Sequence, residues 1–141
     1  MLNYGLQMGI RELAEELYTR LGSEIEINSQ LPESELRYPP AVELHLFRIV
    51  QQACQNTIQH AHATDLNITG RLEQSQVELT VTDNGKGFEA GQELDLNGLL
   101  AGRHFGLAGM YERAALINAQ LKIISAPTQG TKVCVIWNAI E

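Results

Sequence analysis

Cysteine is scarce in this sequence. The 141 residues include two cysteines, Cys54 and Cys134, which stand far apart in apolar stretches. No Cys-x-x-Cys pair or histidine cluster has the spacing of zinc ligands, so neither a disulfide framework nor a zinc site is expected. Both cysteines are predicted to be buried thiols.

Long hydrophobic runs are also missing. Stretches such as residues 133–137 have the length of a strand, whereas a membrane span requires roughly 20 apolar residues. Within residues 1–20, charged residues stand at positions 11, 12, 15, 16 and 20 on a helical pattern, which excludes the apolar segment of a signal peptide. We therefore expect no membrane contact by this segment, and a cytoplasmic location.

Basic residues are few. Ten lysines and arginines stand against 17 acidic residues, which gives a formal net charge of −7. Because an anionic protein does not attract phosphate backbones through its overall field, nucleic acid is not an expected partner. With 44% hydrophobic and 19% charged residues, the composition is that of a globular protein. A domain has roughly 150 residues, so one domain spanning residues 1–141 is expected.

Hydrophobic periodicity predicts a mixture of helices and strands. Helical spacing predicts helices near residues 7–21, 41–61 and 107–117, and alternation predicts strands near residues 25–27, 66–72, 77–81, 121–123 and 133–137. Two pairs of strands follow each other through short turns, which favours an antiparallel or mixed sheet with helices on one face. The expected fold class is α+β, a two-layer α/β sandwich with a mixed, mostly antiparallel sheet.

The long helix predicted over residues 41–61 has a polar stripe beside its apolar one. The polar stripe contains Gln52, Asn56, Gln59 and His60, and the apolar stripe is centred on Val50, Cys54, Thr57 and Ala61. A solvated helix flank is one interpretation, because polar residues usually line the outer faces of helices. Asparagine is a weak helix former, however, so Asn56 in mid-helix also fits a functional role.

Glycine is concentrated in one part of the chain. Half of the 12 glycines lie within residues 84–106, which show no sustained periodicity, so a long loop is expected there. The loop begins at Asp83, the last residue of an alternating strand, and Gly85 and Gly87 follow. It ends in a Gly-x-x-Gly motif, residues 106–109, at the start of a helix, where free N–H groups can bind phosphate. A hairpin turn and an ordinary glycine before a helix are the alternative interpretations.

In this order and at these separations, the motifs resemble those of a known family. Residues 49–61 resemble the N box, residues 83–88 the G1 box and residues 105–114 the G2 box of the ATP-binding catalytic domain of bacterial two-component sensor histidine kinases. Gyrase, the ninety-kilodalton heat-shock chaperone and MutL share the superfamily. The resemblance extends over about residues 6–138 and implies the same two-layer sandwich.

The resemblance implies how the purine would be recognised. Asp83 would accept a hydrogen bond from the adenine amino group, supported by Thr131, which is often linked to it through water. Gly85 and Gly87 would leave room for the purine, and His60 would lie against the nucleotide.

It also implies a site for the phosphates of ATP. Asn56 would hold the Mg²⁺ that bridges them, since its amide oxygen is a suitable hard ligand. A lid over about residues 88–105, with Arg103 as its cation, would close over the nucleotide. Backbone N–H groups would come from Gly106, Leu107 and Gly109.

Two positions depart from the pattern of the family. Gln52 stands at the catalytic position, where glutamate is common, and Gln59 stands where lysine or arginine is frequent. An amide cannot act as a general base, so activation of water is put in doubt. Transfer to a histidine is less affected, because neutral imidazole is itself a nucleophile and the site mainly positions groups and neutralises charge.

The phosphoacceptor histidine of this family lies on a separate dimerising helical hairpin. None of the histidines here, at positions 45, 60, 62 and 104, stands in such a context. The expected partners are ATP, the histidine-bearing dimerisation domain of the same kinase and, indirectly, a response regulator; the parent kinase can itself be membrane-anchored. The chain is expected to be a fragment of such a kinase, or a free-standing ATP-binding module. A non-catalytic nucleotide-binding interaction module and an anti-sigma-factor-type serine kinase of the same fold are the alternatives.

Overall fold

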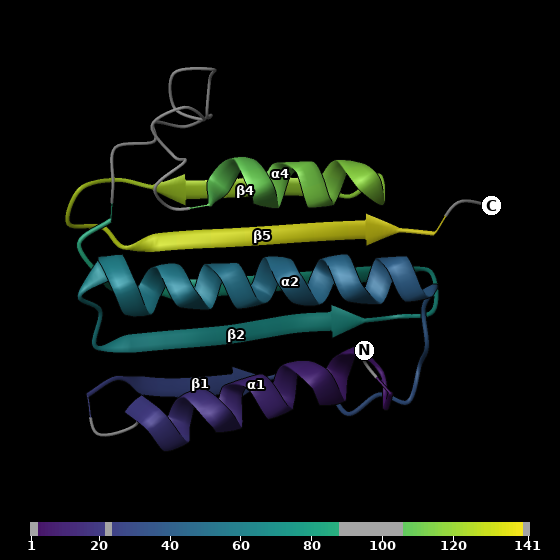
Figure 1. Ribbon diagram of the computed structural model, residues 1–141, viewed down its shortest axis with the longest axis horizontal. Coiled ribbons are helices and arrows are strands. Elements are labelled where there is room, and N and C mark those ends of the chain that lie inside the picture. The colour runs from purple at the N-terminus through teal and green to yellow at the C-terminus, as the bar shows by residue number, and fades with distance from the viewer. Residues whose placement is uncertain (1–2, 22–23, 88–105, 140–141) are drawn as a thin grey trace.

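The computed structural model (Figure 1) describes residues 3–21, 24–87 and 106–139. The helices are α1 (Leu6–Leu21), α2 (Pro40–Asn56) and α4 (Leu107–Leu116), and a π-helical turn, η1 (Thr57–Ala61), continues α2. The strands are β1 (Glu26–Gln30), β2 (Asp65–Leu72), β3 (Gln76–Asp83), β4 (Gln120–Ser125) and β5 (Thr131–Asn138). Every predicted helix and strand is present, in the predicted order. Within the described residues, no helix is long and apolar enough to cross a membrane.

The strands form one mixed sheet in the order β1-β2-β3-β5-β4. β1 pairs with β2 in parallel, and the other neighbouring pairs are antiparallel. In Figure 1 the helices lie on the same side of this sheet, with α1 over β1, α2 over the centre and α4 over β4. The predicted two-layer sandwich with a mixed, mostly antiparallel sheet is therefore confirmed.

The core lies between the helices and the sheet because each element has an apolar side. Leu46 and Ile49 of α2 are at most 1% exposed, as helical spacing requires. Every second residue of a strand points to the helices, and Leu66 and Leu79 are likewise at most 1% exposed. Burial of a side chain of this size contributes about 1.5–3 kcal/mol, so this layer fixes α2 on the sheet.

The two cysteines have different environments. Cys54 of α2 is 1% exposed, and burial raises the pKa of its thiol to about 12, which makes it unreactive at neutral pH. Cys134 is only half-buried: its neighbours Val133 and Val135 point to the helices, so Cys134 lies on the outer face of the sheet. The prediction of buried thiols is correct for Cys54 and wrong for Cys134.

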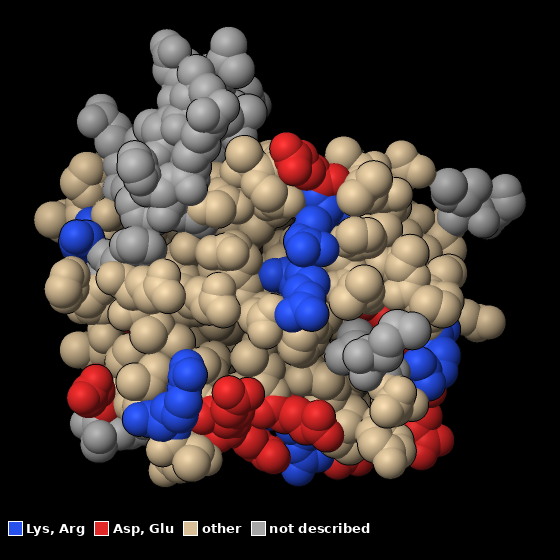
Figure 2. Space-filling model, viewed as in Figure 1, with Lys and Arg blue, Asp and Glu red and all other residues tan. Residues whose placement is uncertain are grey.

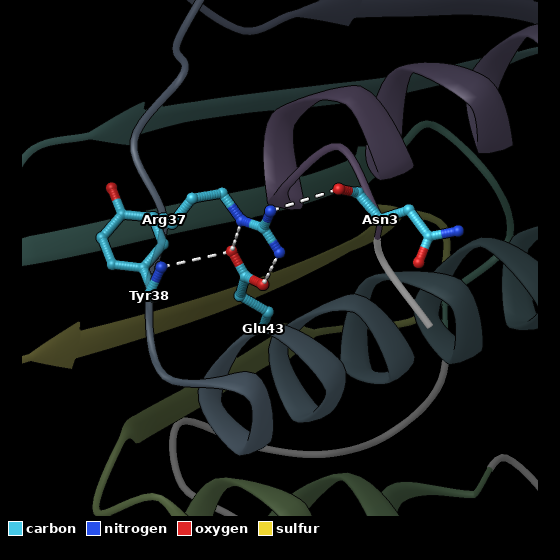
Figure 3. A network of polar contacts seen from close by, with 4 residues as sticks. All are labelled: Asn3, Arg37, Tyr38 and Glu43. Atoms are coloured by element: carbon cyan, nitrogen blue, oxygen red, sulfur yellow. Dashed lines mark hydrogen bonds and ion pairs between the residues drawn. The ribbon is translucent and has the colours of Figure 1, made fainter.

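A buried carboxylate anchors the N-terminal end of α2 (Figure 3). Glu43 is 3% exposed, and it accepts hydrogen bonds from Nε and Nη2 of Arg37, each at 3.0 Å, and from the backbone N–H of Tyr38 at 3.2 Å. Nη1 of Arg37 also donates to the carbonyl oxygen of Asn3 at 3.2 Å. The network fastens the segment before α2 to the first turn of that helix and to the chain before α1.

The other end of α2 departs from the regular helix predicted over residues 41–61. α-Helical geometry extends from Pro40 to Asn56, and the turn from Thr57 to Ala61 is π-helical. His62 then has φ 51°, the left-handed conformation in which many helices end. Single π-turns inside or after α-helices are frequent at functional sites, and this one directly follows Asn56.

Candidate functional site

The carboxylate of Asp83, at the end of β3, is held from two sides. Its Oδ1 accepts a hydrogen bond from the backbone N–H of Gly85 at 2.8 Å, and its Oδ2 accepts one from Oγ1 of Thr57 at 2.9 Å. Asp83 is half-buried, whereas Thr57 is only 2% exposed. Because a carboxylate has about four acceptor positions, two donors orient it and leave it able to accept from a ligand.

Two close backbone contacts shape the loops around Asp83. Gly87 has φ +64° and Gly130 has φ +76°, a region that glycine enters without strain. A Cβ atom on Gly87 would overlap the carbonyl oxygen of Ala126, and one on Gly130 would overlap the carbonyl oxygen of Asp83. The segment after β3 therefore packs directly against the turn between β4 and β5.

Thr131 lies beside Asp83, because the two residues are register partners in β3 and β5. Ser125 of β4 is 3% exposed and donates its hydroxyl proton to the carbonyl oxygen of Gly130 at 3.0 Å. The hydroxyl oxygens of Ser125 and Thr131 are 2.9 Å apart, within hydrogen-bond distance. An acid and two hydroxyls thus form a row across the end of the sheet, on the face that the helices cover.

The polar stripe of α2 faces the start of α4. Gln52 and Asn56 are half-buried, and Nε2 of Gln52 donates to Oδ1 of Asn56 at 3.1 Å. Gly106 precedes α4 with φ +66°, and a Cβ atom there would lie 2.8 Å from Cδ of Gln52. The N-terminus of α4 has no side-chain cap hydrogen bond and no acid in its first turn. The positive end of the α4 dipole therefore begins next to Gln52.

A groove of about 440 Å³ runs between α2 and α4, and it is lined by glutamines, by two glycines and by Arg48 and Arg113. Arg48 donates to Oε1 of Gln51 at 2.7 Å, and Nη1 of Arg113 lies 3.2 Å from Nδ1 of His45. Figure 2 shows basic side chains in a strip across this face of the molecule, from α4 to α2. The groove is therefore locally positive, although the net charge of the chain is −7.

The surroundings of Asn56 suit a metal ion that is bound partly by the protein and partly by the phosphates of a ligand. Among residues 3–21, 24–87 and 106–139, no group of three or more His, Cys, Asp or Glu side chains could hold a metal ion. In phosphate-binding sites, Mg²⁺ is held by one or two protein oxygens together with the phosphates. Oδ1 of Asn56 fits this use, because an amide oxygen is a hard ligand of the kind that Mg²⁺ takes.

The described site residues fall into two neighbouring groups. Asp83, Gly85, Gly87 and Thr131 lie at the end of the sheet, and Gln52, Asn56, Gly106, Leu107 and Gly109 lie where α2 meets the first turn of α4. Thr57 connects the groups, since it follows Asn56 in the chain and contacts Asp83. The side chain of Leu107 is 1% exposed in the core, so only its backbone is available to a ligand.

Two parts of the predicted site lie outside the described residues, and the side chain of a third is not described. The lid predicted over about residues 88–105 and its cation, Arg103, belong to a range that the structure does not describe. His60 is part of η1, but its side chain is not among those described.

Sequence reasoning missed two polar residues beside Asp83. Thr57 falls in the apolar stripe of the predicted helix, and it is buried as that stripe requires, but its hydroxyl contacts Asp83. Asn84 Oδ1 accepts from the backbone N–H groups of Thr64 and Asp65, each at 2.9 Å, and so joins the end of β3 to the start of β2. In the sequence, Thr57 is marked only as a hydroxyl residue among apolar positions, and Asn84 only as an asparagine in a turn-like run. Neither pattern indicates which residue the side chain contacts.

Comparison with known proteins identifies the family of the chain. Residues 41–139 match the model of the histidine kinase-, DNA gyrase B-, and HSP90-like ATPase family. The chain is 34% identical over 129 residues to the sensor histidine kinase LiaS of Bacillus subtilis, and 32% identical over 125 residues to the sensor protein VraS of Staphylococcus haemolyticus. These matches cover 92% and 89% of this chain but 33% of each relative. The chain thus spans about a third of the length of these curated relatives.

Solved structures share the fold at low sequence identity. The ATP binding domain of PrrB from Mycobacterium tuberculosis has a TM-score of 0.68 and 18% identity, and the match covers 97% of this chain and 96% of that domain. The histidine kinase domain of the blue-light activated histidine kinase EL346 from Erythrobacter litoralis has a TM-score of 0.70 and 18% identity, with 95% and 61% covered. By its sequence match, the chain belongs to the histidine kinase-, DNA gyrase B- and HSP90-like ATPase family, and the relatives that it matches are named as sensor proteins or sensor histidine kinases.

Proposed function

We propose that this domain binds Mg²⁺-ATP and donates the γ-phosphoryl group to a histidine on a separate dimerisation domain of a two-component sensor histidine kinase. The observation that carries the proposal is the placement of Asp83. Its carboxylate is fixed at the end of the sheet by Gly85 and by Thr57, the residue that follows Asn56 in the helix. An adenine acceptor and an oxygen ligand for a phosphate-bound cation thereby lie on either side of Thr57.

In this proposal Asp83 recognises the base. Its carboxylate accepts from the amino group of adenine, and the neighbouring hydroxyl of Thr131 lies on the same face of the sheet to support that contact. Guanine carries a carbonyl oxygen at the corresponding position, and two facing acceptors repel each other. The site should therefore prefer ATP to GTP.

The phosphates extend from there toward the start of α4. The uncapped backbone N–H groups at residues 106–109 and the dipole of the helix favour anions, and Oδ1 of Asn56 is the protein ligand for Mg²⁺. When bound there, the metal would supply positive charge against the negative charge that develops during transfer. The chain's own residues orient the nucleotide and exclude other binding geometries.

The groove between α2 and α4 is the side from which the acceptor histidine approaches. Arg48 and Arg113 line it together with Gln52, so a phosphoryl group in transit would face positive charge. Gln52 cannot remove a proton from water, whereas a neutral imidazole attacks phosphorus without a base. The phosphoryl group would then pass from the histidine to a response regulator.

Gln52 also favours a second candidate function, a nucleotide-binding interaction module without transfer activity. The two candidates predict the same ATP binding. They differ in whether radioactive phosphate from γ-labelled ATP appears on the histidine of an added dimerisation domain, which should contain the phosphoacceptor hairpin of the parent kinase. Labelling supports the kinase, and its absence at saturating ATP supports the module.

The adenine assignment is tested with Asp83→Asn. This change keeps the shape of the side chain but presents an amide, so ATP binding should weaken by about 1.5–3 kcal/mol, as for a hydrogen bond to a charged group. Titration calorimetry with ATP and GTP measures the effect, and a thermal melt checks that the variant is folded. Equal affinities of the unmodified chain for ATP and GTP, or an unchanged ATP affinity in Asp83→Asn, would contradict the assignment.

A further inference from the structure

Thr57 is a buried hydroxyl residue whose single proton has two acceptors within reach. Oγ1 lies 2.9 Å from Oδ2 of Asp83 and 3.3 Å from the carbonyl oxygen of Ala53. Hydrogen bonds to a carboxylate are shorter and stronger than those to a neutral carbonyl. The proton of Thr57 therefore points to Asp83.

This contact joins the helix layer to the end of the sheet. Thr57 is 2% exposed and begins the π-helical turn that follows α2, and Asp83 ends β3. The second donor to Asp83, the N–H of Gly85, comes from the strand's own continuation. With one donor on each oxygen, the carboxylate plane cannot rotate without breaking a hydrogen bond.

We propose that Thr57 positions the Asp83 carboxylate for the amino group of adenine and so determines part of the selectivity for that base. The inference rests on the proposed function, in which Asp83 accepts from adenine. Thr57 is a positioning residue, because its hydroxyl acts on the ligand through Asp83. Loss of the hydroxyl leaves Oδ2 without its helix-side donor and frees the carboxylate to turn.

The test compares Thr57→Val, which keeps the shape of the side chain, with Thr57→Ser, which keeps the hydroxyl. Each variant of the 141-residue chain is titrated by calorimetry, in the presence of Mg²⁺, with ATP and with the triphosphate of purine riboside, which lacks the amino group. Thr57→Val should bind ATP about five- to tenfold more weakly, the usual effect of one hydrogen bond, and purine riboside triphosphate less than about twofold more weakly. Thr57→Ser should bind both ligands as the unmodified chain does.

Two outcomes would overturn the inference in different ways. If Thr57→Val loses affinity equally for the two triphosphates, the hydroxyl serves only the packing of the helix on the sheet. The same conclusion follows if Thr57→Ser does not retain the preference of the unmodified chain for ATP. If the unmodified chain does not distinguish ATP from purine riboside triphosphate, the adenine site itself is wrong and the proposed function fails with it. Thermal melts without nucleotide show whether a variant is folded.

Discussion

The contact between Gln52 and Asn56 joins two amides with different proposed roles. Gln52 donates Nε2 to Oδ1 of Asn56, the oxygen proposed to bind Mg²⁺. This hydrogen bond holds Oδ1 of Asn56 toward Gln52, which lies beside Gly106 at the start of α4. A glutamine at this position therefore retains an orienting function, although it cannot act as a base.

Replacement of Asn56 by alanine should weaken ATP binding in a metal-dependent way. The lost group acts through the cation, so the loss should be about 1.5–3 kcal/mol with Mg²⁺ and much smaller when the metal is chelated. Calorimetry with and without a chelator measures the difference. An equal loss under both conditions would indicate that the helix is disturbed and that Asn56 is not a metal ligand.

Gln52→Glu should raise turnover without tightening ATP binding. A general base contributes typically 10²–10⁴ in rate, and a carboxylate at this position can accept from Nδ2 of Asn56, so the pair of side chains survives the change. Phosphate release and phosphotransfer to a histidine-bearing hairpin are the measurements. If the unmodified chain already hydrolyses ATP at about 1 per second, within the usual enzyme range, the residue at position 52 does not limit the rate of hydrolysis, and the assignment of Gln52 as the catalytic position is wrong.

At the scale of elements, α2 carries residues of the site on one end and, on the other, a buried carboxylate paired with the half-exposed Arg37. Glu43 lies in its first turn, and Gln52 and Asn56 lie in its last two turns. A helix of this length behaves as a rigid rod, so the anchor at Glu43 contributes to the position of the amides. Arg37 also donates a hydrogen bond to the carbonyl oxygen of Asn3, so the segment before α2 is linked to the chain before α1 as well.

Glu43→Ala should destabilise the domain far more than loss of an exposed ion pair. It removes the acceptor of the buried backbone N–H of Tyr38 and of Arg37, and a buried donor left unsatisfied costs about 1–3 kcal/mol. The matched control is Glu15→Ala, whose 3.5 Å contact with Arg11 is exposed and contributes about 0–1 kcal/mol. Urea unfolding gives both values, and similar losses would show that the buried network is not an anchor.

Periodicity predicts the elements of this fold well but not their finer geometry. Helical spacing extends through Thr57 and Ala61, so nothing in the pattern distinguishes a π-turn from another α-turn. The strand β1 is recognisable from Ile25 and Ile27, but its parallel pairing with β2 depends on how the chain crosses over through α2. The burial of Cys134 is predicted wrongly because both of its neighbours in the sequence are valines. Such a run fits a strand buried on both faces as well as a strand with one exposed face.

At the scale of the whole molecule, the net charge of −7 is a poor guide to the field in the groove. Exposed charges are screened beyond about 8 Å at physiological ionic strength, so the arginines that line the groove, Arg48 and Arg113, dominate the potential felt by an anion there. The negative net charge argues against nucleic acid as a partner, but it does not argue against a phosphate site within this groove.

The candidate site is predictable from sequence where a motif lies on one segment. Asp83 and Gly85 belong to one such motif, and Gly106 and Gly109 at the start of α4 belong to another. The contact of Thr57 with Asp83 and that of Gly106 with Gln52 join distant segments. Their side chains give no local signal of a partner, so only the folded arrangement identifies them.

The backbone contacts of Gly87 with Ala126 and of Gly130 with Asp83 affect how this domain can be recombined with its relatives. Glycine has no side chain to vary, so correlated substitutions cannot record these contacts. A chimera that took the loop after β3 from one protein and the β4–β5 turn from another would bring together two backbone segments that do not fit each other. The two segments should therefore be exchanged together, although they lie far apart in the chain.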